Sequence, residues 1–535
     1  MDSLKQAPNL NPFWDAILIG SGIGALATAA TLAKHASKRV LVLERHYTAG
    51  GYTHAFHRPG YEWDVGVHYI GQVQSASQSV RRAFDYLTNG QLQWAPMPDV
   101  YDRVILNGRT YDFPTGRDNF RAQLQRYFPK DTAAIDRYLK TVQASNHASG
   151  LYFAEKALPR PIAAVAGPLL RRPFLRWAGR ATLDVLREFT SNEELIGVLT
   201  AQWGDYGLPP AQSSFGIHAM IAEHYFDGAS YPIGGSSRIC DTIAPVIEAA
   251  GGQILVSAEV SEILLEKGRA VGVRMAGGRE FRAPIVISDA GARNTFDRLL
   301  PSPPPALAKL RSELHTIPPS MAHLSLYVGL KHTAAELGLT GTNLWIHPTP
   351  DHDANLRRFS ADPNAPFPVL FVSFPSAKDP DFERRHPGRA TLEIVTAAPY
   401  DWFARWEDSR WRRRPEDYNA FKQQLAARLQ AELERHVPAV AGKIDYAELS
   451  TPLSTRHFMN YERGEAYGLS ATPDRFQLRG LRPQTPIPGL YLTGQDVVSL
   501  GVTGALFGGV VTASAVLGGN LMSVVTGPAR TQRAA

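Results

Sequence analysis

The chain has 535 residues, which is enough to bury a large core and to form more than one structural unit. With 44% hydrophobic and 20% charged residues, its composition is that of a globular protein and excludes a disordered or fibrous chain. A net charge of +6 is mild for this length, so no nucleic-acid partner is predicted, although an anionic lipid surface remains compatible with it. The single cysteine, Cys240, excludes an intrachain disulfide and a cysteine-based metal site.

The first predicted elements form a βαβ unit. Residues 15–20 are a short apolar run that ends in glycine, which is typical of a buried parallel strand. Residues 21–36 are rich in alanine and predict a helix, and residues 39–44 predict a second buried strand. This order of elements within about thirty residues predicts an α/β fold with a doubly wound, Rossmann-like sheet.

A glycine-rich turn joins the first strand to the helix. In Gly20-Ser-Gly22-Ile-Gly24-Ala25, the small residues allow a tight turn, close approach of the backbone to a pyrophosphate, and close packing of the helix on the strand. Glu44 ends the next strand about twenty residues later, where a carboxylate can accept both ribose hydroxyls. Together these features predict a dinucleotide site, and the acidic residue argues against the 2′-phosphate of NADPH.

The predicted secondary structure changes several times after this βαβ unit. Helical patterns dominate residues 76–225, α/β patterns return in residues 226–300, and strands of an antiparallel sheet are indicated within residues 301–480. We therefore predict a nucleotide-binding domain in three pieces, residues 12–75, 226–300 and 481–527. The two remaining segments are predicted to form an inserted α+β domain that binds the substrate.

A glycine doublet, Gly50-Gly51, follows Glu44-Arg45 and lets the backbone close over a pyrophosphate and ribityl chain. This arrangement resembles the glycine-doublet flavoproteins, the superfamily of amine oxidases and phytoene desaturases. The resemblance implies that the dinucleotide is FAD and that Arg45 and the doublet belong to its site. Ser-Ala-Glu-Val260 resembles the superfamily strand whose valine backbone holds the adenine.

The C-terminal region agrees with this resemblance. Pro-Gly-Leu-Tyr-Leu-Thr-Gly494-Gln495-Asp496 predicts a strand, a turn and the glycine-rich start of a helix, with Gly504 inside it. In the superfamily this segment contacts the ribityl chain and the edge of the flavin ring. The usual Gly-Asp pair is replaced here by Gly494-Gln495-Asp496, which leaves open whether Gln495 or Asp496 meets the ribityl hydroxyls.

Two stretches of the sequence resemble one particular family within this superfamily. Val-Gly-Val-His68-Tyr69-Ile-Gly71 and the Gly494-Gln-Asp segment resemble the retinol saturase family, membrane-associated flavoenzymes that reduce one double bond of all-trans-retinol. The implied function is an FAD-dependent oxidoreductase of saturase type, which acts on carbon–carbon double bonds of a retinoid, carotenoid or other long apolar substrate. The alternatives are a polyene desaturase or cis-trans isomerase, a flavin amine oxidase, and a flavin-binding protein without turnover. No second dinucleotide fingerprint follows a strand, so either electrons for a reduction come from an external donor or the reaction is redox-neutral.

A reductase of this kind needs a proton donor for the alkene carbon that does not receive hydride. Tyr69 is the first candidate and His68 the second, because both are expected on a strand that runs toward the flavin. Glu465 and Tyr467 are further candidates, since their turn resembles one that lines the substrate side of the flavin. Each of these four residues has packing as its alternative role. The histidines lack ligand spacing, so no metal site is predicted.

Residues 151–189 alternate large apolar residues with arginines and contain almost no acids. This pattern favours an interfacial segment on an anionic membrane, and its alternative is the basic face of a soluble helical cap. Residues 497–529 carry no charge but are rich in glycine, which predicts a buried helix beside the cofactor rather than a membrane span. With no secretory signal in residues 1–14, the expected location is cytoplasmic with peripheral membrane attachment.

Overall fold

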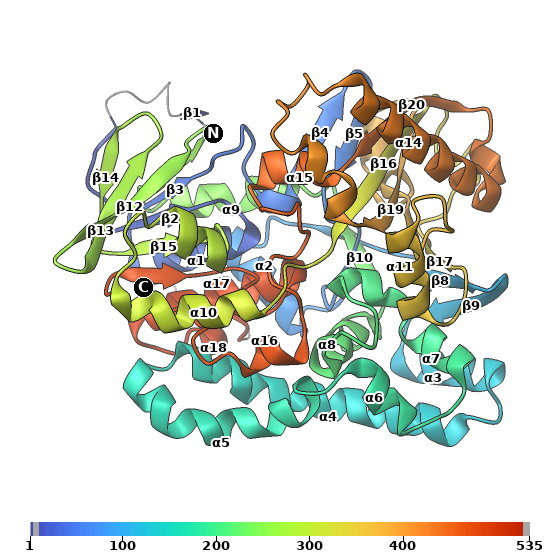
Figure 1. Cartoon of the computed structure of the whole chain (residues 1–535), viewed down its shortest axis with the longest axis horizontal. Coiled ribbons are helices and arrows are strands. Elements are labelled where there is room, and N and C mark those ends of the chain that lie inside the picture. Colours follow the sequence, from blue (N-terminus) through green and yellow to red (C-terminus); the bar gives the residue numbers. More distant parts are fainter. Residues whose placement is uncertain (1, 4–9, 528–535) are drawn as a thin grey trace, which may run out of the picture.

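A six-stranded parallel sheet contains the predicted βαβ unit (Figure 1). The computed structural model describes residues 2–3 and 10–527, so the predictions for residues 1–14 and 497–529 lie partly outside it. The strands run in the order β1 (Asp2–Ser3), β11 (Gln253–Val256), β3 (Val40–Leu43), β2 (Ala16–Ile19), β15 (Val286–Ser288) and β21 (Leu490–Leu492). All residues of β2, β3 and β15 are buried, as expected for a parallel sheet covered on both faces.

An alanine-rich helix and a glycine-rich helix pack closely beside this sheet. α1 (Ile23–Ala36) follows the predicted fingerprint, and α17 (Gly501–Leu517) is the predicted uncharged helix. A Cβ atom on Gly509 would lie 2.4 Å from the carbonyl oxygen of Gly24, so the helices can approach this closely only through glycine. Within residues 2–3 and 10–527, no helix is both long and apolar enough to cross a membrane.

A seven-stranded sheet forms the core of the second region. Its order is β20 (Ile444–Ser450), β16 (Ala322–Leu330), β19 (Ala390–Ala398), β18 (Leu370–Ser373), β17 (Asn343–His347), β8 (Val100–Leu106) and β9 (Arg109–Pro114). Neighbouring strands are antiparallel except for β17 and β8. The antiparallel sheet was predicted, but its β8–β9 hairpin lies in a segment for which helices were expected.

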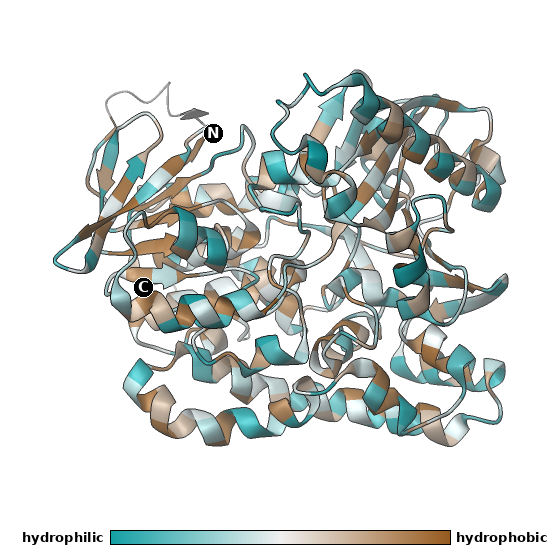
Figure 2. Cartoon of the chain, viewed as in Figure 1, coloured by the Kyte–Doolittle hydropathy of each residue, from teal (hydrophilic) through white to brown (hydrophobic). Residues whose placement is uncertain are grey.

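Six helices between residues 117 and 225 form a layer along the lower edge of the molecule in Figure 1. They are α3 (Arg117–Tyr127), α4 (Thr132–Ala157), α5 (Arg160–Ala178), α6 (Thr182–Arg187), α7 (Glu193–Leu199) and α8 (Phe215–Tyr225). Figure 2 shows hydrophobic and hydrophilic residues mixed along α4 and α5. α4 also contacts α17, so this layer touches the nucleotide-binding region. The exact boundaries of the two predicted domains stay a prediction.

Smaller elements complete the two regions. The remaining strands are β4 (Ala55–Arg58), β5 (Tyr61–Asp64), β6 (Ile70–Gly71), β7 (Trp94–Pro96), β10 (Ala229–Pro232), β12 (Val260–Glu266), β13 (Arg269–Met275) and β14 (Glu280–Arg282). The remaining α-helices are α2 (Ser79–Thr88), α9 (Arg238–Glu248), α10 (Ala308–Thr316), α11 (His352–Ala361), α12 (Pro375–Lys378), α13 (Phe382–Arg385), α14 (Glu416–His436), α15 (Pro452–Met459), α16 (Pro473–Gln477) and α18 (Met522–Val525). His68 and Tyr69 lie in the connection between β5 and β6, so the prediction that they belong to a strand is wrong.

Candidate active site

The glycine fingerprint and the carboxylate predicted to accompany it lie together at the start of α1. Gly20 has a φ of +95°, which favours glycine, and it turns the chain from β2 toward the helix. Glu44 Oε2 accepts hydrogen bonds from the backbone N–H and the hydroxyl of Ser21, at 2.9 and 2.6 Å. The backbone N–H of His46 donates to Glu44 Oε1 at 2.7 Å. The carboxylate is therefore fixed at the end of β3, beside the fingerprint.

The glycine doublet closes over this turn. Gly50 has a φ of +118°, and its N–H donates to the Ser21 hydroxyl at 3.0 Å. A Cβ atom on Gly51 would lie 2.9 Å from Gly22 Cα, so the two glycine segments approach as closely as the sequence implied. Arg45 points away toward the 457–459 segment, where Nη1 donates to the carbonyl of His457 at 2.7 Å.

The C-terminal segment meets the same turn from the other side. A Cβ atom on Gly24 would lie 2.4 Å from Gly494 Cα, which explains why both positions carry glycine. Gln495 Nε2 donates to the Tyr461 hydroxyl at 2.9 Å, and Asp496 Oδ2 accepts the backbone N–H of Ala292 at 2.8 Å. Gln495 and Asp496 both line the cavity described next, so a ribityl contact from either stays a prediction.

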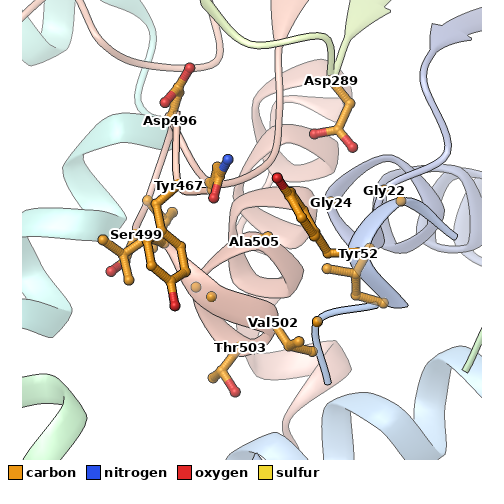
Figure 3. A pocket seen from close by; sticks show the side chains of 18 of the residues that line it. Gly22, Gly24, Tyr52, Asp289, Tyr467, Asp496, Ser499, Val502, Thr503 and Ala505 are labelled. Atoms are coloured by element: carbon orange, nitrogen blue, oxygen red, sulfur yellow. The ribbon is translucent and has the colours of Figure 1, made fainter. Parts of the chain in front are cut away.

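A cavity of about 1090 Å³ connects these segments to the second region. Its volume lies just above the roughly 300–1,000 Å³ of a usual ligand pocket, so it is large enough for an extended ligand. In Figure 3, Gly22 and Tyr52 lie on one side, Tyr467 and Ser499 lie on the other, and α17 forms a wall. The predicted cofactor residues that line it are Gly20, Gly22, Gly24, Glu44, Arg45, Gly51, Val260, Gln495, Asp496 and Gly504.

The donors in this cavity fit FAD. The N-terminal end of α1 offers backbone N–H groups to a diphosphate, and Glu44 offers a carboxylate to a ribose. Val260 begins β12 at the nucleotide end of the cavity. A Cβ atom on Gly504 would lie 2.4 Å from the carbonyl oxygen of Ser499, so only glycine fits at the start of α17.

Asp289 is a cavity residue that the sequence analysis missed. It follows β15, and its Oδ2 accepts the backbone N–H of Ala25 at 3.2 Å. Burial, together with the negative charges of Glu44 and Asp496, raises the pKa of Asp289 to about 7, against the hydrogen bond from Ala25. Its position after a buried parallel strand, like that of Glu44, is the sequence signal that could have identified it.

Tyr69 lies at the far end of the cavity, in contact with two carboxyl groups. Its Oη is 3.0 Å from Asp102 Oδ2 and 3.1 Å from Asp205 Oδ2, and its ring stacks on Tyr225 with centroids 4.3 Å apart. Burial and both carboxyls raise the pKa of Tyr69 well above its ordinary value. The Tyr69 side chain is therefore a neutral phenol with acidic groups directly behind it.

His68 lines the cavity next to Tyr69 but is held neutral. Its carbonyl oxygen accepts Lys378 Nζ at 2.9 Å, and its Nδ1 lies 3.2 Å from Glu393 Oε2. Burial, together with the charge of Lys378, lowers the pKa of His68 to about 3. Burial also raises the pKa of Glu393 to about 8. A neutral imidazole is a weak acid, so His68 would need a proton from another group before it could act as a proton donor.

The two remaining candidate proton donors, Tyr467 and Glu465, differ in whether they line the cavity. Tyr467 lines the cavity, and its hydroxyl donates to the carbonyl of Gly204 at 3.2 Å. Glu465 turns back on its own loop, where Oε2 accepts the backbone N–H of Arg463 at 2.8 Å. Glu465 is not among the described residues that line the cavity, which argues against its contact with a substrate.

The comparisons with known proteins agree with the site. A family model described as flavin containing amine oxidoreductase matches residues 26–517. An all-trans-retinol 13,14-reductase from Danio rerio is 39% identical over 529 residues, which cover 95% of this chain and 86% of that protein. An inactive all-trans-retinol 13,14-reductase from the same species is 32% identical, covering 94% of this chain and 85% of that protein. A chloroplastic prolycopene isomerase from Arabidopsis thaliana is 28% identical, covering 94% and 82%.

Among solved structures, wild-type putrescine oxidase bound to putrescine superposes with a TM-score of 0.62 and covers 95% of this chain and 99% of that chain. At 17% identity this likeness shows the fold alone. The predicted α/β fold with a Rossmann-like FAD-binding region is confirmed by this likeness together with the family match. The chain is an FAD-dependent oxidoreductase and belongs to the flavin-containing amine oxidoreductase family.

Proposed function

We propose that this chain reduces one carbon–carbon double bond of a retinoid or a similar long apolar polyene. The observation that carries the proposal is the extent of the likeness to an all-trans-retinol 13,14-reductase, 39% identity over nearly the whole chain. The cavity supports it, because the part beyond the nucleotide residues is walled mainly by aromatic and aliphatic side chains. These include Met220, Tyr225, Trp345, Phe371, Val395 and Tyr467.

In this proposal reduced FAD supplies the hydride, and the residues of the chain supply placement and a proton. Tyr225, Trp345 and Phe371 would hold the polyene against the flavin and keep water from the reacting bond. Tyr69 is the proposed proton donor, because its hydroxyl lies at this end of the cavity and remains protonated. The external electron donor that would reduce FAD again stays a prediction, as do the domain boundaries and the cytoplasmic location.

The proposed place of action is an anionic membrane surface, with α5 as the contact. Val165 and Leu169 on this helix are 84% and 76% exposed, which is unusual for large apolar side chains, and Arg172 and Arg176 are exposed on the same helix. Among the arginines of residues 151–189 that were expected at the membrane, Arg171 is only 7% exposed and its Nε donates to the carbonyl of Gly167, so it does not belong to this exposed face.

The cavity extends to the connection between α4 and α5. Phe153 and Leu158, at the end of α4 and before α5, line the cavity, so an apolar substrate could pass from a membrane into it without crossing water. The basic face of a soluble helical cap is the alternative, and it predicts no partition onto membranes.

Flavin reoxidation tests the proposed reaction. The enzyme is photoreduced without oxygen and mixed with all-trans-retinol or a carotenoid, the oxidised enzyme is mixed with a primary amine, and flavin absorbance is followed in each case. Reoxidation of the reduced flavin by a polyene, and no reduction of the oxidised flavin by the amine, are expected. A reduced flavin that persists with every polyene would contradict the proposal, and polyenes recovered unchanged would then favour a flavin-binding protein without turnover, as the name of the inactive relative suggests for that protein. Isomerisation is the second candidate, because of the prolycopene isomerase relative, and it changes the polyene without net flavin reoxidation.

A further inference from the structure

The Tyr69 hydroxyl lies between the carboxyl groups of Asp102 and Asp205. This arrangement determines how many protons the hydroxyl and the two carboxyl groups share. Its oxygen is within hydrogen-bonding distance of Asp102 Oδ2 and Asp205 Oδ2, at 3.0 and 3.1 Å. A phenol has one hydrogen, so it can donate to only one of these oxygens at a time. The second short contact then requires a protonated carboxyl that donates to the phenol oxygen. Two ionised carboxylates this close would also repel each other strongly.

The surroundings of Asp102 favour its ionised form over that of Asp205. It is completely buried on β8, and its Oδ2 accepts Trp345 Nε1 at 3.0 Å and Gln202 Nε2 at 2.7 Å. Its Oδ1 accepts Asn343 Nδ2 at 2.8 Å. An indole N–H can only donate, so Asp102 Oδ2 acts as an acceptor there. A carboxylate with three donors around it keeps its charge at low cost.

Asp205 has the opposite surroundings. It lies on the short 3₁₀ segment Ala201–Tyr206, is half-buried, and lines the cavity. Among the described residues, Tyr69 is the only hydrogen-bond partner of its carboxyl. Burial and the charge of Asp102 raise the pKa of Asp205 well above its ordinary value, whereas hydrogen bonds oppose the rise at Asp102. The other titratable groups that face this pair are Tyr101, Tyr206, Tyr225, Tyr467 and Lys378.

We propose that Asp205 is the protonated carboxyl of this pair and the proton source of the reaction, acting through Tyr69. The inference rests on the proposed function. One alkene carbon receives hydride, with its two electrons, from reduced FAD. The Tyr69 hydrogen turns from Asp102 to the other alkene carbon, where a C–H bond forms as the Tyr69 O–H bond breaks, and the Asp205 proton passes to the Tyr69 oxygen. Asp205 is left as a carboxylate, which takes a proton from water before the next turnover.

The backbone around Asp205 supports this assignment. A Cβ atom on Gly204 would lie 2.8 Å from the Trp345 ring, so the neighbouring position carries glycine to let this segment reach the cavity. The Tyr467 hydroxyl holds the same segment through the carbonyl of Gly204. The segment is thus fixed from two sides, with the Asp205 carboxyl directed at Tyr69.

Two measurements on the FAD-loaded enzyme test the assignment. The first is the infrared difference spectrum between the wild type and Asp205→Asn, in which we expect the band of one protonated carboxyl to disappear. Other buried acids, such as Glu393, are present in both proteins and cancel. The second is single-turnover reoxidation of the reduced flavin by all-trans-retinol over a range of pH. Asp205→Asn should slow it about 10²–10⁴-fold and remove the fall in rate toward high pH that titration of Asp205 gives the wild type.

Asp205→Glu, which keeps an acid, should retain part of the rate, and the exposed Asp184→Asn should behave as wild type. An unchanged infrared spectrum, or wild-type reoxidation by Asp205→Asn, would overturn the inference. Bound FAD and unchanged circular dichroism show that each variant is folded. If no polyene reoxidises the wild type, the proposed function fails, and the infrared measurement still decides whether Asp205 holds the proton.

Discussion

The carboxyl group of Asp289 accepts a hydrogen bond from the backbone N–H of Ala25, at 3.2 Å, where a diphosphate is expected to bind at the start of α1. An ionised Asp289 would repel the phosphates, whereas a protonated one could donate to them. Because burial raises the pKa of Asp289 to about 7, the neutral form dominates below that pH. We therefore predict that the affinity of the apoprotein for FAD falls above pH 7, by up to about tenfold per pH unit.

Asp289→Asn removes the charge and keeps the size of the side chain. The variant should bind FAD as tightly at high pH as the wild type does at low pH, as measured by quenching of flavin fluorescence. Glu259→Gln is a matched control, since Glu259 lines the cavity but pairs with Arg45 at 3.2 Å. A dependence on pH that persists in Asp289→Asn would show that another group is responsible.

Glu44→Ala should weaken FAD binding by about 1–3 kcal/mol, the cost of losing hydrogen bonds to a charged group. Glu44 also accepts a hydrogen bond from the Ser21 hydroxyl, which in turn accepts the backbone N–H of Gly50. Without Glu44 the glycine doublet Gly50-Gly51 should therefore be held less firmly over the site. Equilibrium dialysis of the apoprotein with FAD measures the effect. Glu248→Ala, an exposed change at the end of α9, serves as control, and equal affinity of both variants would contradict the role of Glu44.

Tyr69→Phe removes one hydroxyl and little volume. If Tyr69 passes the proton to the alkene, turnover should fall by about 10²–10⁴-fold while FAD stays bound, as is usual when general acid catalysis is lost. Tyr86→Phe on α2 is the control, since Tyr86 contacts Lys34 far from the cavity. Near-normal turnover by Tyr69→Phe in a steady-state assay would remove Tyr69 from the mechanism.

Much of the protein should sediment with vesicles that contain anionic lipid and be released by high salt. Replacing Val165 and Leu169 with serine and Arg172 and Arg176 with glutamate should move it to the supernatant, since each arginine contributes about 1 kcal/mol near an anionic leaflet. Arg410→Glu with Arg412→Glu changes exposed arginines elsewhere and should leave partition unchanged. If the α5 variant sediments like the wild type, the soluble-cap alternative is the better one.

The nucleotide half of the site could be predicted because its residues follow one another along the chain. The turn after β2, Glu44 after β3 and the doublet lie within residues 20–51, and each has a local requirement that the sequence displays. α17 could be predicted for the same reason, since an uncharged, glycine-rich run is needed wherever two helices approach this closely.

The catalytic half could not be predicted, because its partners are distant in the sequence. Asp102 and Asp205 are 33 and 136 positions from Tyr69, and no local pattern places them beside it. The β8–β9 hairpin did have a local signal. Asn107-Gly108, both with positive φ, joins two alternating strands, and this dipeptide is typical of a tight hairpin. The helical character of the following residues masked that signal.

The mass of the product tests the central claim most directly. FAD-loaded enzyme is reduced with dithionite in deuterated water, mixed with all-trans-retinol, and the product is analysed by mass spectrometry and NMR. We expect a product that has gained two hydrogens across one double bond, both of them deuterium, because the hydrogen on reduced flavin and the acidic proton both exchange with the solvent. A product of unchanged mass would mean isomerisation, a loss of two hydrogens would mean desaturation, and either result would contradict the proposed reduction.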